Sequence, residues 1–177
     1  AGDGGFVLNV ESGRVDHAAH AGNAYRMLTD NVEFAEAVQT ALDMVDLDET
    51  LIIVTADHAH TVTLAGYAQR GNDILGLVRG LDGQGEPVDE PVLAADGKPY
   101  TSIGFANGPG AADIIGQPER PTLTEEMVLD RDFRQQALVP MSSETHGGTD
   151  IITYAHGPHA FLVRGVATFT STYGMAW

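Results

Sequence analysis

The chain has 177 residues, of which 43% are hydrophobic, so it can bury one sizeable core, and none of its apolar stretches is long enough to span a membrane. It carries 9 Lys and Arg residues against 25 Asp and Glu residues, which gives a net charge of −16, and Lys98 is its single lysine. This charge repels nucleic-acid phosphates and anionic lipid, so we expect neither nucleic acid nor a membrane as a partner.

The acidic, lysine-poor composition has two interpretations. It is typical of proteins from a salty habitat, where counter-ions screen self-repulsion, and it also occurs in ordinary acidic proteins. A phosphate-handling site in such a chain would need bound cations to reverse the local sign of the charge. The chain has no cysteine, which excludes disulfides and thiolate ligands without indicating a compartment.

The first 65 residues carry the pattern of a parallel α/β sheet. The apolar run at residues 6–10 predicts a buried strand. Asp30, followed three residues later by Glu33, predicts the start of a helix over residues 31–45. Residues 51–55 predict a buried parallel strand, so the three elements together predict a right-handed βαβ unit.

The region from residue 66 to residue 143 is rich in glycine and proline and is expected to be an excursion from that sheet. Residues 144–177 are then expected to return the chain to the sheet core, within one domain overall. We predict three further strands and two short helical turns: strands at 100–106, 151–155 and 160–163, and turns at 124–126 and 132–137.

Three short segments, at residues 11–20, 55–60 and 144–148, contain five of the seven histidines, with carboxylates close by. Ligands of open α/β sheets bind beyond the carboxyl ends of strands, so loops at one sheet edge can gather such segments. Carboxylates and imidazoles together suit borderline ions such as Zn²⁺. The remaining histidines, His156 and His159, are expected to be surface or packing residues.

Each segment alone has a simpler interpretation. Asp16 and His20 are four residues apart, so one helical face could hold an ion between them, but an exposed pair of little consequence has the same spacing. Asp57 and His58 would point to opposite faces of a regular strand, although a turn at the strand end can re-aim them; an N-cap aspartate beside a surface histidine is the alternative. His146 is followed by two glycines, and a single His-Gly-Gly run is by itself weak evidence for a metal ligand. The coincidence of all three segments favours a metal site.

These segments resemble alkaline phosphatases. The resemblance rests on the run Glu-Ser-Gly-Arg-Val-Asp-His-Ala-Ala-His at 11–20, Val-Thr-Ala-Asp-His-Ala-His at 54–60 and Glu-Thr-His-Gly-Gly at 144–148, and it extends from about residue 6 to residue 166. It implies an α/β fold: part of a three-layer sandwich with a central, mostly parallel sheet. Residues 66–143 would then form a crown-like insertion.

The resemblance implies two zinc ions and one magnesium ion as cofactors. Asp16, His20 and His146 would bind the first zinc, and Asp57 and His58 would contribute to the second. Glu11 would be a magnesium ligand. His60 would orient Asp16, and His17 would lie near the phosphate.

The implied activity is hydrolysis of small phosphate monoesters through a phosphoserine. The family's serine nucleophile, bridging aspartate and phosphate-gripping arginine lie upstream of the matched region, so we expect an upstream segment of the same gene product to supply them. A homodimer and a periplasmic or secreted location are also implied. Two alternatives stay open: a related metallohydrolase of phosphodiesterase, sulfatase or phosphoglycerate mutase type, and a metal-binding fragment without turnover.

Overall fold

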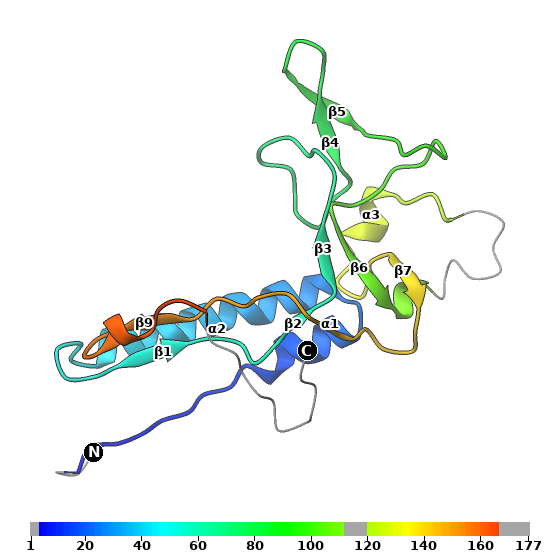
Figure 1. Ribbon diagram of the computed structural model, residues 1–177. Coiled ribbons are helices and arrows are strands. Elements are labelled where there is room, and N and C mark those ends of the chain that lie inside the picture. The colour runs from blue at the N-terminus through cyan, green and yellow to red at the C-terminus, as the bar shows by residue number, and fades with distance from the viewer. Residues whose placement is uncertain (1–3, 112–119, 167–177) are drawn as a thin grey trace. The chain divides into compact units, whose positions relative to one another are not determined.

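The computed structural model describes residues 4–111 and 120–166 (Figure 1). The chain divides into two compact units, which are described separately below. Unit 1 comprises Ala1–Phe34 and Thr61–Thr145, and unit 2 comprises Ala35–His60 and His146–Trp177. The expected excursion over residues 66–143 therefore lies within unit 1.

Unit 1 combines helices with a small mixed sheet. Its three-stranded sheet has the order β3-β6-β7, with β3 antiparallel to β6 and β6 parallel to β7. A separate hairpin pairs β4 with β5. The elements of unit 1 are α1 (Gly13–His20), the first part of α2 (Ala24–Met44), β3 (Val62–Leu64), β4 (Arg79–Leu81), β5 (Pro87–Pro91), β6 (Ile103–Gly108), η1 (Pro109–Ala111), α3 (Glu125–Val128) and β7 (Ala137–Pro140).

Two hydrophobic clusters hold unit 1 together. In the first, Ala19 of α1 packs with Phe105 of β6 and Ala137 of β7, so the cluster fixes α1 against the sheet. In the second, Leu77 packs with Leu123 and with Val128 of α3. Burial of apolar surface of this kind contributes most of the stability of a small unit.

Unit 2 contains the rest of α2 and two short antiparallel strand pairs. β1 pairs with β9, and β2 pairs with β8. Its elements after α2 are β1 (Ile52–Val54), β2 (Ala59–His60), β8 (His146–Gly147), β9 (Tyr154–His156) and the 3₁₀ helix η2 (Ala160–Leu162).

The structure corrects the expected parallel βαβ unit. Residues 6–10, all of them described, form no strand, and Val7 is fully exposed. A strand needs a hydrogen-bonded neighbour, and none of the strands in the described part of the chain pairs with this run. β1 does form within residues 51–55, but it is antiparallel to β9, and Ile53 is 53% exposed. The expectation that this strand is buried and parallel is therefore wrong.

The long helix begins earlier than the sequence pattern predicted. α2 starts at Ala24, because the side chain of Asn23 accepts a hydrogen bond from the backbone N–H of Arg26 at 2.9 Å, as an N-cap residue does. The side chain of Gln135 accepts from the backbone N–H of Ala24 at 2.7 Å, which satisfies a second free donor of the first turn. Asp30 therefore lies inside the helix and does not cap it.

Two further segments differ from the prediction, and three agree with it at least in part. Residues 132–136 are not helical, since the chain there leads into β7, whose Ala137 pairs with Phe105. Residues 160–162 form η2 instead of a strand, after His159 has turned the backbone into the left-handed region at φ 62°. The strands predicted at 100–106 and 151–155 are confirmed in part by β6 and β9, and the turn predicted at 124–126 is confirmed by α3.

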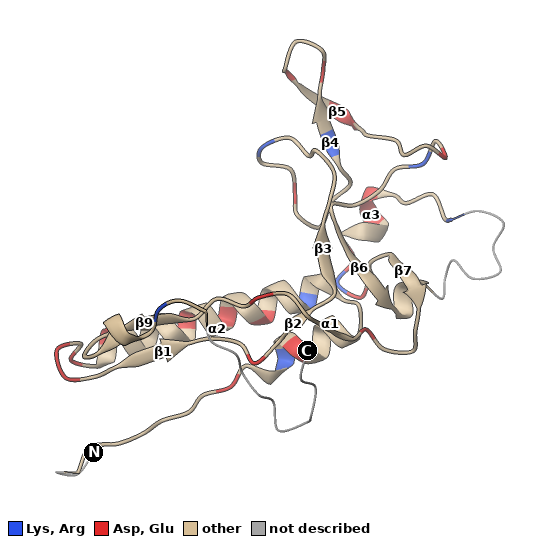
Figure 2. Ribbon diagram, in the orientation of Figure 1, with Lys and Arg blue, Asp and Glu red and all other residues tan. Residues whose placement is uncertain are grey.

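Acidic residues are spread along the chain, as its negative net charge requires. Figure 2 shows that acidic positions outnumber basic ones along the ribbon, with several on α2. Three of the described arginines form ion pairs: Arg79 with Glu125 at 3.0 Å, Arg120 with Asp96 at 2.5 Å, and Arg26 with Asp132. Within the described residues, the helices are too short or too polar to cross a bilayer.

Candidate functional site

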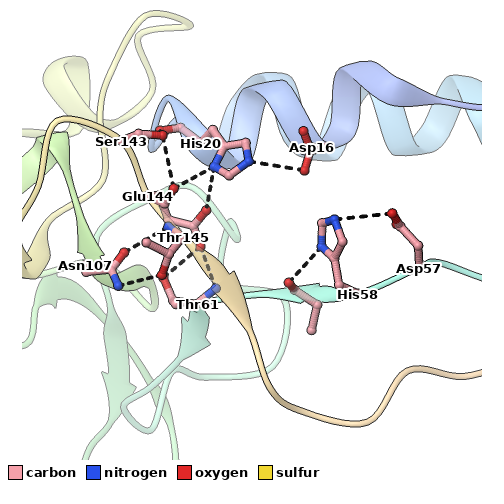
Figure 3. A network of polar contacts seen from close by, with 10 residues as sticks. Asp16, His20, Asp57, His58, Thr61, Asn107, Ser143, Glu144 and Thr145 are labelled. Atoms are coloured by element: carbon pink, nitrogen blue, oxygen red, sulfur yellow. Dashed lines mark hydrogen bonds and ion pairs between the residues drawn. The ribbon is translucent and has the colours of Figure 1, made fainter. Parts of the chain in front are cut away.

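The first candidate ligand pair lies on α1. Ala18 and Ala19 are buried on the inner side of this helix, which leaves Asp16 and His20 half-exposed on another side. One helical turn separates them, and Nε2 of His20 lies 3.4 Å from Oδ1 of Asp16 (Figure 3). The spacing of Asp16 and His20 therefore falls on a helix, and their two side chains lie close together.

The hydrogen bond at the other ring nitrogen of His20 indicates its tautomer. Nδ1 lies 2.6 Å from the backbone carbonyl oxygen of Glu144. A carbonyl oxygen only accepts, so Nδ1 carries a hydrogen, and in the neutral ring the lone pair is on Nε2. The 3.4 Å between Nε2 and Oδ1 of Asp16 exceeds a usual N–H···O distance of about 2.7–3.2 Å. An imidazole lone pair facing a carboxylate oxygen is a donor set that fits Zn²⁺.

The segment that carries Glu144 is held by a network of polar contacts (Figure 3). Oε1 of Glu144 accepts hydrogen bonds from the backbone N–H of Thr61 at 2.6 Å and from its hydroxyl at 2.8 Å. The Asn107 side chain accepts from the backbone N–H of Thr145 at 3.0 Å and donates to its hydroxyl oxygen at 2.8 Å. β6 and the residue before β3 therefore fix residues 144 and 145 in place.

Unit 2 gathers the remaining candidate ligands. Nε2 of His58 lies 3.4 Å from Oδ2 of Asp57, so the end of β1 has turned the two neighbours toward each other. His60 and His146 face each other across the β2–β8 pair. The His58 ring stacks on that of His146 with 3.4 Å between centroids, and the His60 ring lies edge-on to both, at 5.2 Å and 5.4 Å.

Glycine at position 147 is required for this strand pair. A Cβ on Gly147 would lie 2.4 Å from the backbone oxygen of His60, far inside ordinary contact distance. The His-Gly sequence thus has a structural reason: the backbone of β8 approaches β2 closely at the residue after His146.

The other candidates are in simpler surroundings. Glu11 is exposed and lies just before α1, and His17 is exposed on that helix. Glu144 and Thr61 also belong to this site, although no motif in the sequence marks them as site residues. A glutamate two residues before a candidate ligand looks like a surface residue, and its burial depends on contacts that are distant in sequence.

The structure therefore brings the predicted residues together in two groups. Within unit 1, the side chains of Asp16 and His20 lie close together, and Glu144 lies beside His20. Within unit 2, one carboxylate and three imidazoles cluster: Asp57, His58, His60 and His146. Both groups offer oxygen and nitrogen donors of the kind that bind zinc in proteins.

Comparison with known proteins identifies the family. The sequence model described as Alkaline phosphatase matches residues 2–175. The chain belongs to the alkaline phosphatase family, and the resemblance inferred from its motifs is confirmed. It is 40% identical over 163 residues to the tissue-nonspecific isozyme of alkaline phosphatase from Felis catus, and 39% identical to that of Rattus norvegicus. It is also 40% identical over 173 residues to alkaline phosphatase 4 of Drosophila melanogaster.

These alignments cover most of this chain and a smaller part of its relatives. They include 92% of the chain but 28%, 28% and 27% of the cat, rat and fly proteins, respectively. The chain thus spans less than a third of the length of these relatives. Family membership supports an α/β fold and metal-binding chemistry of the hydrolase type.

Proposed function

We propose that this chain takes part in the hydrolysis of phosphate monoesters at a site with two zinc ions and one magnesium ion. The observation that carries the proposal is the pair on α1: a carboxylate oxygen and the lone-pair nitrogen of a histidine, 3.4 Å apart, within a family-specific motif. Family membership over residues 2–175 supports the same reaction class.

The proposed ligands are those implied by the family motifs. Asp16, His20 and His146 would hold one zinc, and Asp57 and His58 would contribute to the other. Carboxylate and imidazole ligands are the usual protein ligands of zinc, and Glu11 offers the oxygen ligand that magnesium prefers. When bound, such ions stabilise the charge of a transferring phosphoryl group and of the attacking and leaving oxygens.

The chain's own residues would orient these ligands. The hydrogen bond from Nδ1 of His20 to the Glu144 carbonyl holds the ring with Nε2 toward Asp16. We propose that His60 orients Asp16 and that His17 acts near the substrate phosphate without binding a metal. The serine nucleophile would come from an upstream segment of the same gene product.

Several further expectations come from the family resemblance alone and remain proposals. They are a crown-like role for residues 66–143, a three-layer sandwich in the whole protein, a homodimer, and a periplasmic or secreted location. Small phosphate monoesters are the proposed substrates.

The test is an activity assay with matched substrates. The chain is joined to the upstream segment, loaded with zinc and magnesium, and given a chromogenic phosphate monoester, a phosphate diester and a sulfate ester. We expect the monoester to be hydrolysed fastest and the His20→Ala variant to lose most of this activity. Preference for the diester or the sulfate ester would favour a related metallohydrolase, and absence of turnover with all three would favour a metal-binding role without catalysis.

A further inference from the structure

Glu144 is a buried carboxylate, and it is not among the metal ligands or supporting residues that the family motifs imply. It is 1% exposed, whereas its neighbour His146 is exposed. Burying a carboxylate is costly unless hydrogen bonds compensate, so the partners of Glu144 indicate what holds it there.

The main chain of Glu144 binds His20 in both directions. The backbone N–H of Glu144 donates to the backbone oxygen of His20 at 2.9 Å, and Nδ1 of His20 donates to the backbone oxygen of Glu144 at 2.6 Å. The ring of His20 is therefore oriented by residue 144 and also anchored to it through its own carbonyl group.

The carboxylate fixes the position of that main chain. Its Oε1 accepts two hydrogen bonds from Thr61, at 2.6 Å and 2.8 Å, and bonds to a charged acceptor are stronger than neutral ones. Its Oε2 lies 3.7 Å from Nδ1 of His20, and a carboxylate oxygen, which accepts hydrogen bonds, suits a ring nitrogen that carries a hydrogen. Side chain and backbone of Glu144 thus favour the same tautomer.

We propose that Glu144 is a positioning residue that holds His20 in the Nδ1–H tautomer and so presents Nε2 as a metal ligand. This inference rests on the proposed zinc site at His20. It assigns Glu144 a role through His20 and no contact of its own with the metal. Partners that orient a ligating histidine in this way typically change metal affinity about 10- to 100-fold when they are lost.

Two measurements on the 177-residue chain test the proposal. The first is zinc affinity, by competition with a chromogenic chelator. The second is the tautomer of His20, from long-range ¹H–¹⁵N NMR correlations recorded without metal, which does not depend on zinc. The variants are Glu144→Ala, Glu144→Gln and Thr61→Val. Glu125→Gln, which alters the ion pair with Arg79, is the matched control.

For Glu144→Ala we expect zinc affinity about 10- to 100-fold weaker and a mixture of His20 tautomers. Glu144→Gln, whose amide oxygen can still accept from Thr61, should lose less, and the control should match the wild type. If Glu144→Ala does not fold, Glu144→Gln and Thr61→Val carry the test, each with a smaller loss in the same direction. Unchanged tautomer and affinity in the folded variants, while His20→Ala still weakens zinc binding, would overturn the role of Glu144. If His20→Ala leaves zinc binding unchanged, the proposed zinc site itself fails. The tautomer measurement, which needs no metal, then still shows whether Glu144 orients His20, so failure of the zinc site and failure of the role of Glu144 can be told apart.

Discussion

The close approach of β8 to β2 makes Gly147→Ala a sharp perturbation of the proposed ligand group in unit 2. The added Cβ would lie 2.4 Å from the backbone oxygen of His60, and real Cβ contacts essentially never fall under 3.0 Å. The obstructing atom belongs to the backbone, so no side-chain rotation can relieve the clash. The two strands must separate near His146.

The size of the effect follows from the displacement. Ordinary contact begins near 3.4 Å, so the strands must move apart by about 1 Å. Overpacking of this kind costs roughly 1–3 kcal/mol of stability. Ligand distances at a metal site tolerate only about 0.2 Å, so a shift of His146 by about 1 Å should weaken zinc binding about tenfold or more.

The assay compares zinc affinity and the free energy of unfolding for Gly147→Ala and a matched control. Gly83→Ala is the control, because a Cβ at position 83 would meet nothing within 4 Å. We expect the control to behave like the wild type in both measurements. Wild-type zinc affinity in a folded Gly147→Ala chain would refute the argument that this backbone approach positions a metal ligand.

Three further predictions concern stability. The hydrogen bonds from Arg120 lower the pKa of the Asp96 carboxyl, so this ion pair stabilises the fold above the ordinary carboxyl pKa of about 3.9, and the stabilisation is lost as pH falls through the lower folded value. The melting temperatures of wild type and Asp96→Asn should therefore differ most near neutral pH and converge in acid. A gap that stays constant with pH would contradict this. Ile103 is 2% exposed, so Ile103→Ala should lower the free energy of unfolding by about 2–5 kcal/mol in urea titrations, and a loss below about 1 kcal/mol would show that the site collapses around the cavity. Screening of the −16 charge should raise the melting temperature as NaCl is added under saturating metal, and a steady fall would argue against self-repulsion as the cause.

Local sequence signals predicted local structure well. The spacing of Asp16 and His20 allows both to lie on one face of a helical turn, and α1 provides that turn. The turn predicted at residues 124–126 forms as α3, where the hydroxyl of Thr124 accepts from the backbone N–H of Met127 at 3.3 Å. Such signals depend on residues within one turn of each other, so the sequence contains the relevant partners.

Features that depend on distant partners were predicted less well. The apolar runs at 6–10 and 51–55 indicate surface that favours burial, but they do not specify the neighbouring strand or its direction. Asn23 and Asp30 are both acceptable caps, and the choice between them involves Gln135, which is more than a hundred residues away. Glu144 is buried for the same reason, since Thr61 and His20 are both distant in sequence.

The most direct test of the proposed site is anomalous diffraction at the zinc absorption edge from crystals of the chain grown with zinc. We predict a peak within coordination distance of Asp16, His20 and His146, about 2.0–2.2 Å from the ligand atoms, which is lost in His20→Ala crystals. Crystals in which zinc is bound without any of these three residues would contradict the assignment.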